Sequence, residues 1–250
     1  MQLNNYYQKK RYEEPAIKWR ESDYFPRRLS DLKNKLGVTL KGKVLDAGCG
    51  DGGMAKEIKR VYPKVSMYGI DISKHGCKLA ERYCKEAKVC DLNKKIPYPD
   101  NTFDYVIAQE IIEHLVDPDN CFEEFRRVLK PNGKLIITTP NLLAWHQRVL
   151  CLFGIIPTFS ELSTRDRTVG LGPLKYVLKN RQPVGHIHVF TLYGLIDMAH
   201  LYKYHVVKIA ARNIEYSFPL TLKYIYNFFD RFFSLFPSLG SNLLMVLEKK

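Results

Sequence analysis

Five short and almost continuously apolar runs lie between residues 43 and 140, and helical patterns fall between them. Strands that are buried on both faces have this composition, and parallel strands need crossover helices between them. The pattern therefore predicts an α/β fold with a doubly wound, mostly parallel sheet between two helical layers. The runs are KVLDA, VSMYGID, AKVCD, DYVIAQ and KLIITTP.

Helix boundaries follow from capping residues and from the spacing of apolar residues. Ser73 and Asp117 are predicted N-caps, and Thr191 caps a later helix that reaches about Tyr202. The sequence LKPNGK at residues 129–134 predicts a turn before the fifth strand. Helices are expected at 23–36, 54–61, 73–84, 118–129, 142–153 and 191–202, and final strands at YHVVKIAAR and NLLMVLEKK.

The chain of 250 residues suits one large domain with additional segments. Residues 1–40 are polar, basic and aromatic, and are predicted to form an N-terminal helical appendage to a domain at 41–250. The alternation of strands and helices stops at residues 141–189. An irregular segment of this length is usually functional or disordered, so this insertion is expected to cover the substrate site as a lid.

The composition is that of a folded protein with a basic surface. A formal charge of +13 should attract polyanions or anionic lipid headgroups. The six cysteines form no CxxC pair, and the first residues lack the apolar stretch of a secretory signal. No run reaches the roughly 18 apolar residues of a membrane span, so we expect a cytoplasmic protein.

A glycine loop follows the first strand in the sequence GKVLDAGCGDGG. Its GxGxxG spacing is typical of a nucleotide site, but a pyrophosphate there would lie near Asp46 and Asp51, which would repel it. A ligand that carries positive groups fits better. S-adenosylmethionine (SAM) has an ammonium and a sulfonium and no phosphate, which predicts that Asp46 is a partner of its methionine portion.

Two more acids stand at strand ends. Asp71 follows the loop by about twenty residues, where a carboxylate accepts hydrogen bonds from ribose hydroxyls in this architecture. Asp91 ends the third strand and is placed to meet the adenine edge. Three acids at one edge of the predicted sheet favour a site for a nucleoside ligand that carries positive groups.

The segments VLDAGCGDG, YGIDIS, VCDL, FDYVIAQEIIEHLVDP and LKPNGKLIITTPN occur in this order between Lys43 and about Asn141. Together they resemble the Rossmann-like (class I) SAM-dependent methyltransferases, and small-molecule O-methyltransferases in particular. The resemblance implies a seven-stranded sheet with an antiparallel last strand and SAM across the carboxyl ends of the strands. It implies that Gln109 and Glu110 face the methyl group. The SAM-binding residues that it implies are Asp46, Gly48, Cys49, Gly50, Asp51, Gly52, Asp71, Ile72, Asp91, Leu92, Gln109 and Glu110.

The segment QEIIEHLVDP places Glu110, Glu113 and His114 at i, i+3 and i+4, which is one face if the segment is helical. Such a face could bind a divalent metal ion, and His186 and His188 supply further candidate ligands. The pattern is similar to small-RNA 3′-terminal ribose methyltransferases and ubiquinone-pathway O-methyltransferases, where it holds a divalent ion near the acceptor hydroxyl. The longer histidine-rich motif of the RNA enzymes is not reproduced here. Many methyltransferases of this type also carry ExxEH and use no metal, so no metal ligand is assigned.

Without a metal, His114 could orient the substrate and His186 or His188 could act as a general base. The predicted catalytic residues are Glu110, His114 and His186. The predicted activity is SAM-dependent methyl transfer to a hydroxyl of a small molecule, anionic or lipid-like. One alternative is an RNA ribose methyltransferase that uses a divalent metal, which the basic charge permits but no RNA module supports. Another is a SAM-binding or membrane-associated interaction protein without turnover.

The segment 222–236, LKYIYNFFDRFFSLF, has the apolar spacing of an amphipathic helix. Packing of its apolar side onto the sheet, or over the pocket, is favoured over peripheral contact with a membrane. The basic surface keeps the membrane interpretation open.

Overall fold

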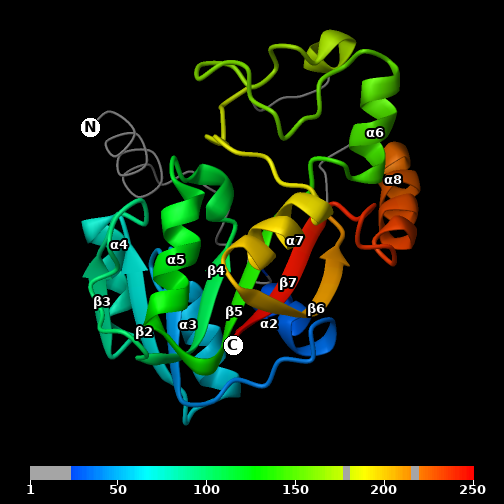
Figure 1. Ribbon diagram of the computed structural model, residues 1–250. Coiled ribbons are helices and arrows are strands. Elements are labelled where there is room, and N and C mark those ends of the chain that lie inside the picture. The colour runs from blue at the N-terminus through cyan, green and yellow to red at the C-terminus, as the bar shows by residue number, and fades with distance from the viewer. Residues whose placement is uncertain (1–23, 177–180, 215–219) are drawn as a thin grey trace.

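The computed structural model describes residues 24–176, 181–214 and 220–250 (Figure 1). A seven-stranded sheet with the order β3-β2-β1-β4-β5-β7-β6 forms its centre. The first five strands are parallel, and β7 pairs antiparallel with both β5 and β6. The predicted sheet, including its antiparallel last strand, is confirmed. The strands are β1 (Lys43–Ala47), β2 (Ser66–Asp71), β3 (Glu86–Val89), β4 (Phe103–Gln109), β5 (Leu129–Pro140), β6 (Tyr204–Arg212) and β7 (Asn242–Lys249).

Helices cover both faces of the sheet (Figure 1). The side chains of Ser73, Asp117 and Thr191 accept hydrogen bonds from the first turns of α4, α5 and α7, which confirms the three predicted caps. Helix α4 ends at Ala80, four residues before the predicted end at Cys84. The helices are α2 (Tyr24–Asn34), α3 (Gly53–Val61), α4 (Lys74–Ala80), α5 (Pro118–Val128), α6 (Trp145–Leu152), α7 (Leu192–Leu201) and α8 (Leu220–Phe233), with 3-10 turns η3 (Ile112–His114) and η4 (Gly172–Tyr176).

Two hydrophobic cores lie on opposite faces of the sheet, because neighbouring strand residues point to opposite sides. In β1, Val44 belongs to one core and Leu45 to the other. Leu29 and Leu32 of α2 join the same core as Val44. The described part of the predicted 1–40 appendage therefore packs into the core that contains Val44.

The sequence LKPNGK forms the irregular beginning of β5. Leu129 pairs with Phe103, and pairing resumes at Lys134 with Tyr105, so four residues bulge out between the two pairs. Asn132 has a φ of 61°, which explains why Asn stands in this position. The predicted turn chemistry is present, but it lies inside the strand that it was expected to precede.

The described residues of the insertion at 141–189 form a lobe beyond the sheet, and α6 and α8 stand together at one edge of the molecule (Figure 1). The expectation that the apolar side of α8 packs onto the sheet is wrong for its described side chains. Phe229 and Phe232 are exposed, whereas the polar residue Asp230 is buried. Within the three described ranges, no helix combines the length and apolar character needed to span a membrane.

Candidate functional site

The glycine loop between β1 and α3 turns on three glycines with positive φ. Gly48, Gly50 and Gly52 have φ values of 76°, 52° and 83°, which side chains rarely allow. At Gly48 a Cβ would also lie 2.1 Å from Cδ1 of Ile111. The predicted loop is therefore formed by residues that no larger side chain could replace without strain. Cys49 is buried against Gly69, where a Cβ would lie 2.7 Å from its sulfur atom, so its side chain packs below the loop.

Asp71 at the end of β2 connects the loop to the next helix. Its Oδ2 accepts from the backbone N–H of Gly50 at 2.9 Å, and its Oδ1 accepts from that of Ser73 at 2.8 Å. A carboxylate offers about four lone-pair sites, so ribose hydroxyls can still donate to it. Asp51 accepts from the N–H of Gly53 at 3.2 Å. Ile72 directly follows Asp71 at the end of β2.

Asp46 is buried beside the loop and lacks a complete set of partners. Its Oδ2 has no hydrogen-bond partner. Burial, followed by the negative charge of Asp71, raises the pKa of Asp46 from 3.8 to about 7. A positively charged ligand group at this position would relieve both effects.

Unpartnered buried atoms gather near the carboxyl ends of β1 and β4. Buried polar atoms in folded proteins are normally hydrogen-bonded, so such a group marks a place for a ligand. These atoms belong to carboxyl, guanidinium or amide groups, of the kind that can pair with the ammonium and carboxylate of an amino acid. The residues present therefore fit the methionine end of SAM. The atoms are Oδ2 of Asp46, Nε of Arg28, Nε2 of Gln109 and Oε1 of Glu113.

Arg28 enters the site from α2, a contribution that the sequence patterns did not reveal. Its Nη1 donates to Oε1 of Gln109 at 3.1 Å, and its guanidinium lies 4.3 Å from the ring centre of Tyr24. Burial lowers the pKa of Arg28, while the negative charge of Glu110 opposes that effect. The available signal was the amphipathic pattern of residues 23–36, on which Arg28 stands next to the core residue Leu29.

Glu110 has a φ of 55°, and its carboxylate is held by residues of the neighbouring strands. Its Oε1 accepts from Thr138 at 2.8 Å, from Asn242 at 2.7 Å and from Arg212 at 3.4 Å. Burial acts to raise the pKa of Glu110, but the charges of Arg28 and Arg212 bring it below the ordinary value. Glu110 is therefore an anion that holds several elements together.

The residues predicted to meet the adenine, Asp91 and Leu92, follow the end of β3. Asp91 lies just beyond β3, and its Oδ1 accepts from the backbone N–H of Asn93 at 3.0 Å and from its side-chain amide at 2.8 Å. Asn93 in turn accepts from the N–H groups of Val116 and Asp117. The side chain of Leu92 is buried in the core, which leaves its backbone as the part that could meet a base.

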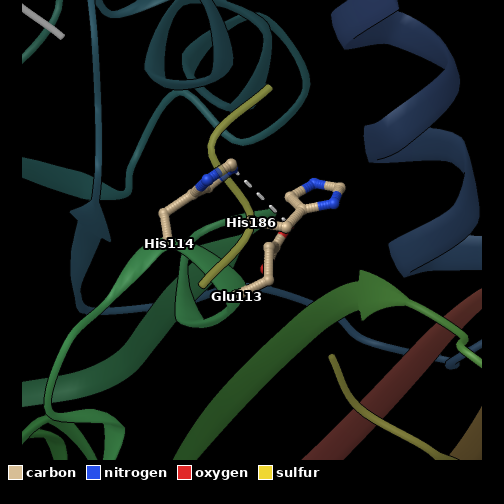
Figure 2. A group of neighbouring side chains, drawn as sticks. All are labelled: Glu113, His114 and His186. Atoms are coloured by element: carbon tan, nitrogen blue, oxygen red, sulfur yellow. Dashed lines mark ion pairs between the residues drawn. The ribbon is translucent and has the colours of Figure 1, made fainter. Parts of the chain in front are cut away.

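Glu113, His114 and His186 come together above the end of β4 (Figure 2). One ligand atom from each residue lies within 4.8 Å of the other two, so this acid–histidine cluster could hold a metal ion. Oε1 of Glu113 lies 3.9 Å from Nε2 of His114, and the two imidazole centres are 5.1 Å apart. The predicted set of Glu110, Glu113 and His114 is not what the structure brings together. Because Glu110 has a positive φ, it lies outside the short helical turn Ile112–His114. His186 is the third member of the cluster instead of Glu110.

The protonation of the cluster follows from its surroundings. Burial, followed by the charge of Glu110, raises the pKa of Glu113 well above its ordinary value. Burial lowers the pKa of His186. Because a carbonyl oxygen only accepts, the bond between Nδ1 of His186 and the oxygen of Phe159 at 3.1 Å assigns the proton to Nδ1 and the lone pair to Nε2.

The insertion fixes His186 through Glu161. The two carboxylate oxygens of Glu161 accept from the N–H groups of Val184 at 2.6 Å, Gly185 at 2.7 Å and His186 at 3.3 Å. The carbonyl of Gly185 lies 2.9 Å from Nδ1 of His114. His188 is not part of the cluster, because its ring contacts the carbonyl oxygen of Val116 at 3.4 Å.

The fold and site together define the class of protein: a doubly wound α/β domain with a glycine loop and acidic side chains at the carboxyl ends of its parallel strands. Residues 45–137 match the family model described as a methyltransferase domain. The chain is 30% identical over 161 residues to a demethylmenaquinone methyltransferase of a Geobacillus species, an alignment that covers 60% of this chain and 65% of that protein. It is 35% identical over 115 residues to the human mitochondrial ubiquinone biosynthesis O-methyltransferase, which covers 42% of this chain and 31% of the relative.

A solved structure from Thermotoga maritima has the same fold. It is described as a SAM-dependent methyltransferase and possible histamine N-methyltransferase, and it superposes with a TM-score of 0.63 at 16% identity over 99% of this chain and 100% of that one. Residues 45–137 therefore form a methyltransferase domain, and the chain has the Rossmann-like fold of the class I SAM-dependent methyltransferases. It spans less than two thirds of the length of the demethylmenaquinone methyltransferase and of the human O-methyltransferase.

Proposed function

We propose that the protein transfers a methyl group from SAM to a hydroxyl group of a small molecule that is anionic or lipid-like. Relatives of the chain are named for O-, C- and N-methylation. Two of them are named for demethylmenaquinone and for ubiquinone biosynthesis, which favours a lipid-like acceptor. The observation that carries the choice of a hydroxyl is the partly buried acid–histidine cluster, because a hydroxyl acceptor must lose a proton.

The proposed binding of SAM divides its charges among the side chains of the site. Asp46 pairs with the ammonium group, and Arg28 pairs with the carboxylate of the methionine portion. Asp71 accepts from the ribose hydroxyls, and Asp91 accepts from the adenine amine. The loop glycines let the ligand approach the backbone, as the sequence predicts.

Bound SAM supplies a methyl group that is already activated by its sulfonium, so the protein must align the acceptor and exclude water. When the hydroxyl oxygen bonds to the methyl carbon and the bond from that carbon to sulfur breaks, leaving a neutral thioether, Nε2 of His186 would accept the hydroxyl proton. The lowered pKa of His186 keeps the imidazole neutral near neutral pH, which this step requires. Glu113 and His114 are positioning residues, and Glu110 holds the floor of the site through Arg212 and Asn242.

We favour a general base over a metal centre at this cluster. Its carboxyl group is stabilised in the neutral form by burial and by the charge of Glu110. A metal ion needs the deprotonated carboxylate, so binding of a divalent ion would first have to remove that proton.

Transfer of labelled methyl groups from SAM tests the proposal. The full chain is incubated with separate lipid, water-soluble metabolite and RNA fractions of a cell extract, and His186→Gln is the matched control. We expect label in the lipid or metabolite fraction with the wild type and little with the variant. Label in RNA alone would favour the ribose methyltransferase interpretation. Tight calorimetric binding of SAM without transfer to any fraction would favour a binding protein.

A further inference from the structure

Helix α8 turns its polar side to the protein and its aromatic side to solvent. Asp230 is 0% exposed, and it accepts hydrogen bonds from Nε1 of Trp145 at 2.9 Å, from the hydroxyl of Ser241 and from the N–H of Ile214 at 2.8 Å. Tyr224 and Phe228, by contrast, are 72% and 69% exposed. An amphipathic helix on a globular protein normally has the opposite orientation. Packing among the described residues therefore does not account for the apolar side of α8.

Helix α6 extends the same apolar edge. The ring of Trp145 stacks on Phe233 with centres 5.2 Å apart, which joins the two helices. Beyond that contact, Leu152 and Phe153 are 84% and 76% exposed. The exposed phenylalanines of the described residues all lie at the end of α6 or along α8 and the turn after it. They are Phe153, Phe228, Phe229, Phe232 and Phe236.

Such a concentration of large apolar side chains is typical of a contact surface. We call it the α6–α8 surface. It is defined by Leu152, Phe153, Tyr224, Phe228, Phe232, Leu235 and Phe236.

The exposed charged side chains of α6, of the described part of α8 and of residues 154–176 are positive. Arg148 and Arg231 are exposed on the two helices, and Arg165 and Lys175 are exposed on the insertion. Within 141–176 and 224–236, the carboxylates are buried or bound: Asp230 is buried, Glu161 accepts from three backbone N–H groups, and Asp166 pairs with Arg181. The whole chain carries a formal charge of +13. The surface therefore combines exposed aromatic side chains with unbalanced positive charge.

We propose that the α6–α8 surface docks on an anionic membrane, with α8 lying in the plane of the interface. Aromatic and aliphatic side chains then enter the boundary between headgroups and acyl chains, and Arg148 and Arg231 meet the lipid phosphates. A second copy of the chain fits this surface less well, because an isologous contact would bring together two surfaces of the same positive charge. The inference goes beyond methyl transfer and does not depend on the acceptor.

Vesicle binding by the full chain tests the proposal. Co-sedimentation is measured with vesicles of phosphatidylglycerol and phosphatidylcholine, and with vesicles of phosphatidylcholine alone. We expect binding to the anionic vesicles that weakens as salt is added. The variant Phe228→Ser/Phe232→Ser loses two rings that the bilayer would bury, which should reduce the partition constant on the order of a hundredfold. Arg231→Gln should reduce it about fivefold.

The matched control is Tyr193→Ser/Leu201→Ser, which removes two exposed apolar side chains of α7, outside this surface. It should bind vesicles as the wild type does, and thermal unfolding verifies that each variant is folded. Wild-type binding by the Phe228/Phe232 variant would overturn the proposal, as would the absence of binding to both kinds of vesicle. A wild-type dimer that this variant dissociates, without binding to vesicles, would show instead that a second copy covers the surface.

Discussion

Replacement of Asp46 by Asn should stabilise the fold while it weakens binding of SAM. Burial and the charge of Asp71 raise the pKa of Asp46 from 3.8 to about 7. Between these two pH values the unfolded chain releases the Asp46 proton and the folded chain retains it, so rising pH favours unfolding. At about 1.4 kcal/mol per pKa unit, the full effect above pH 7 is about 4 kcal/mol. An asparagine does not ionise and escapes this effect.

The measurement is urea denaturation of wild type and Asp46→Asn at about pH 5 and about pH 8, on either side of most of this transition. A buried amide without partners costs about 1–3 kcal/mol, so we expect a net gain of about 1–3 kcal/mol for the variant at the higher pH. The gain should be much smaller at the lower pH. An equal difference between variant and wild type at both pH values would refute the electrostatic reasoning.

Asp104→Asn is a control of opposite sign. Hydrogen bonds from Lys130 and from the N–H of Lys43 outweigh burial and lower the pKa of Asp104. Ionised Asp104 therefore stabilises the fold above the unfolded pKa, and this contribution is lost as the pH falls through the folded pKa. The Asp104 variant should lose stability at the higher pH. In thermal melts, SAM should protect the wild type and the Asp104 variant but protect the Asp46 variant weakly.

Four other changes test the site. Arg28→Ala should weaken calorimetric binding of SAM about ten- to a hundredfold through loss of a charged hydrogen bond, and Arg28→Lys should recover part of it. His186→Gln should lower kcat by about 10²–10⁴ with SAM affinity unchanged, and because burial lowers the pKa of His186, the acid decline of wild-type kcat should lie below pH 6.5. Gly48→Ala should abolish SAM binding or unfold the chain, because the added methyl group would collide with Ile111. Gly154 also has a positive φ but has open space around it, so Gly154→Ala should lower the free energy of unfolding only slightly in denaturation assays. Chelation should leave turnover unchanged, and a loss that Mn²⁺ restores would contradict the general-base assignment.

The parts of the fold that could be predicted depend on local patterns. Strand positions, capping residues and the glycine loop follow from the period of apolar residues and from backbone conformations that only glycine adopts readily. The strand-end acids Asp46 and Asp71 were placed correctly at one edge, because parallel strands bring their carboxyl ends to the same side.

The errors arose where distant segments decide the outcome. The prediction that Glu110, Glu113 and His114 share one face required a helix, and the positive φ of Glu110 is incompatible with that helix. Its charge is instead satisfied by Arg212 and Asn242, which lie more than a hundred residues away. No local pattern contains such a contact.

Helix α2 and helix α8 show the same limit. Arg28 reaches the site because Leu29 and Leu32 pack into the core beside α3, which the polar character of the first forty residues did not suggest. In α8 the sequence reveals an apolar side, but it does not reveal what that side contacts. The buried Asp230 reverses the expected orientation.

The attachment of His186 to Glu161 and Phe159 ties the proposed base to the insertion. Any displacement of residues 159–161 would move the imidazole with them, because both the ring and the backbone N–H of His186 bond to that segment. A substitution at Glu161 would therefore change the position of the proposed proton acceptor without touching its ring.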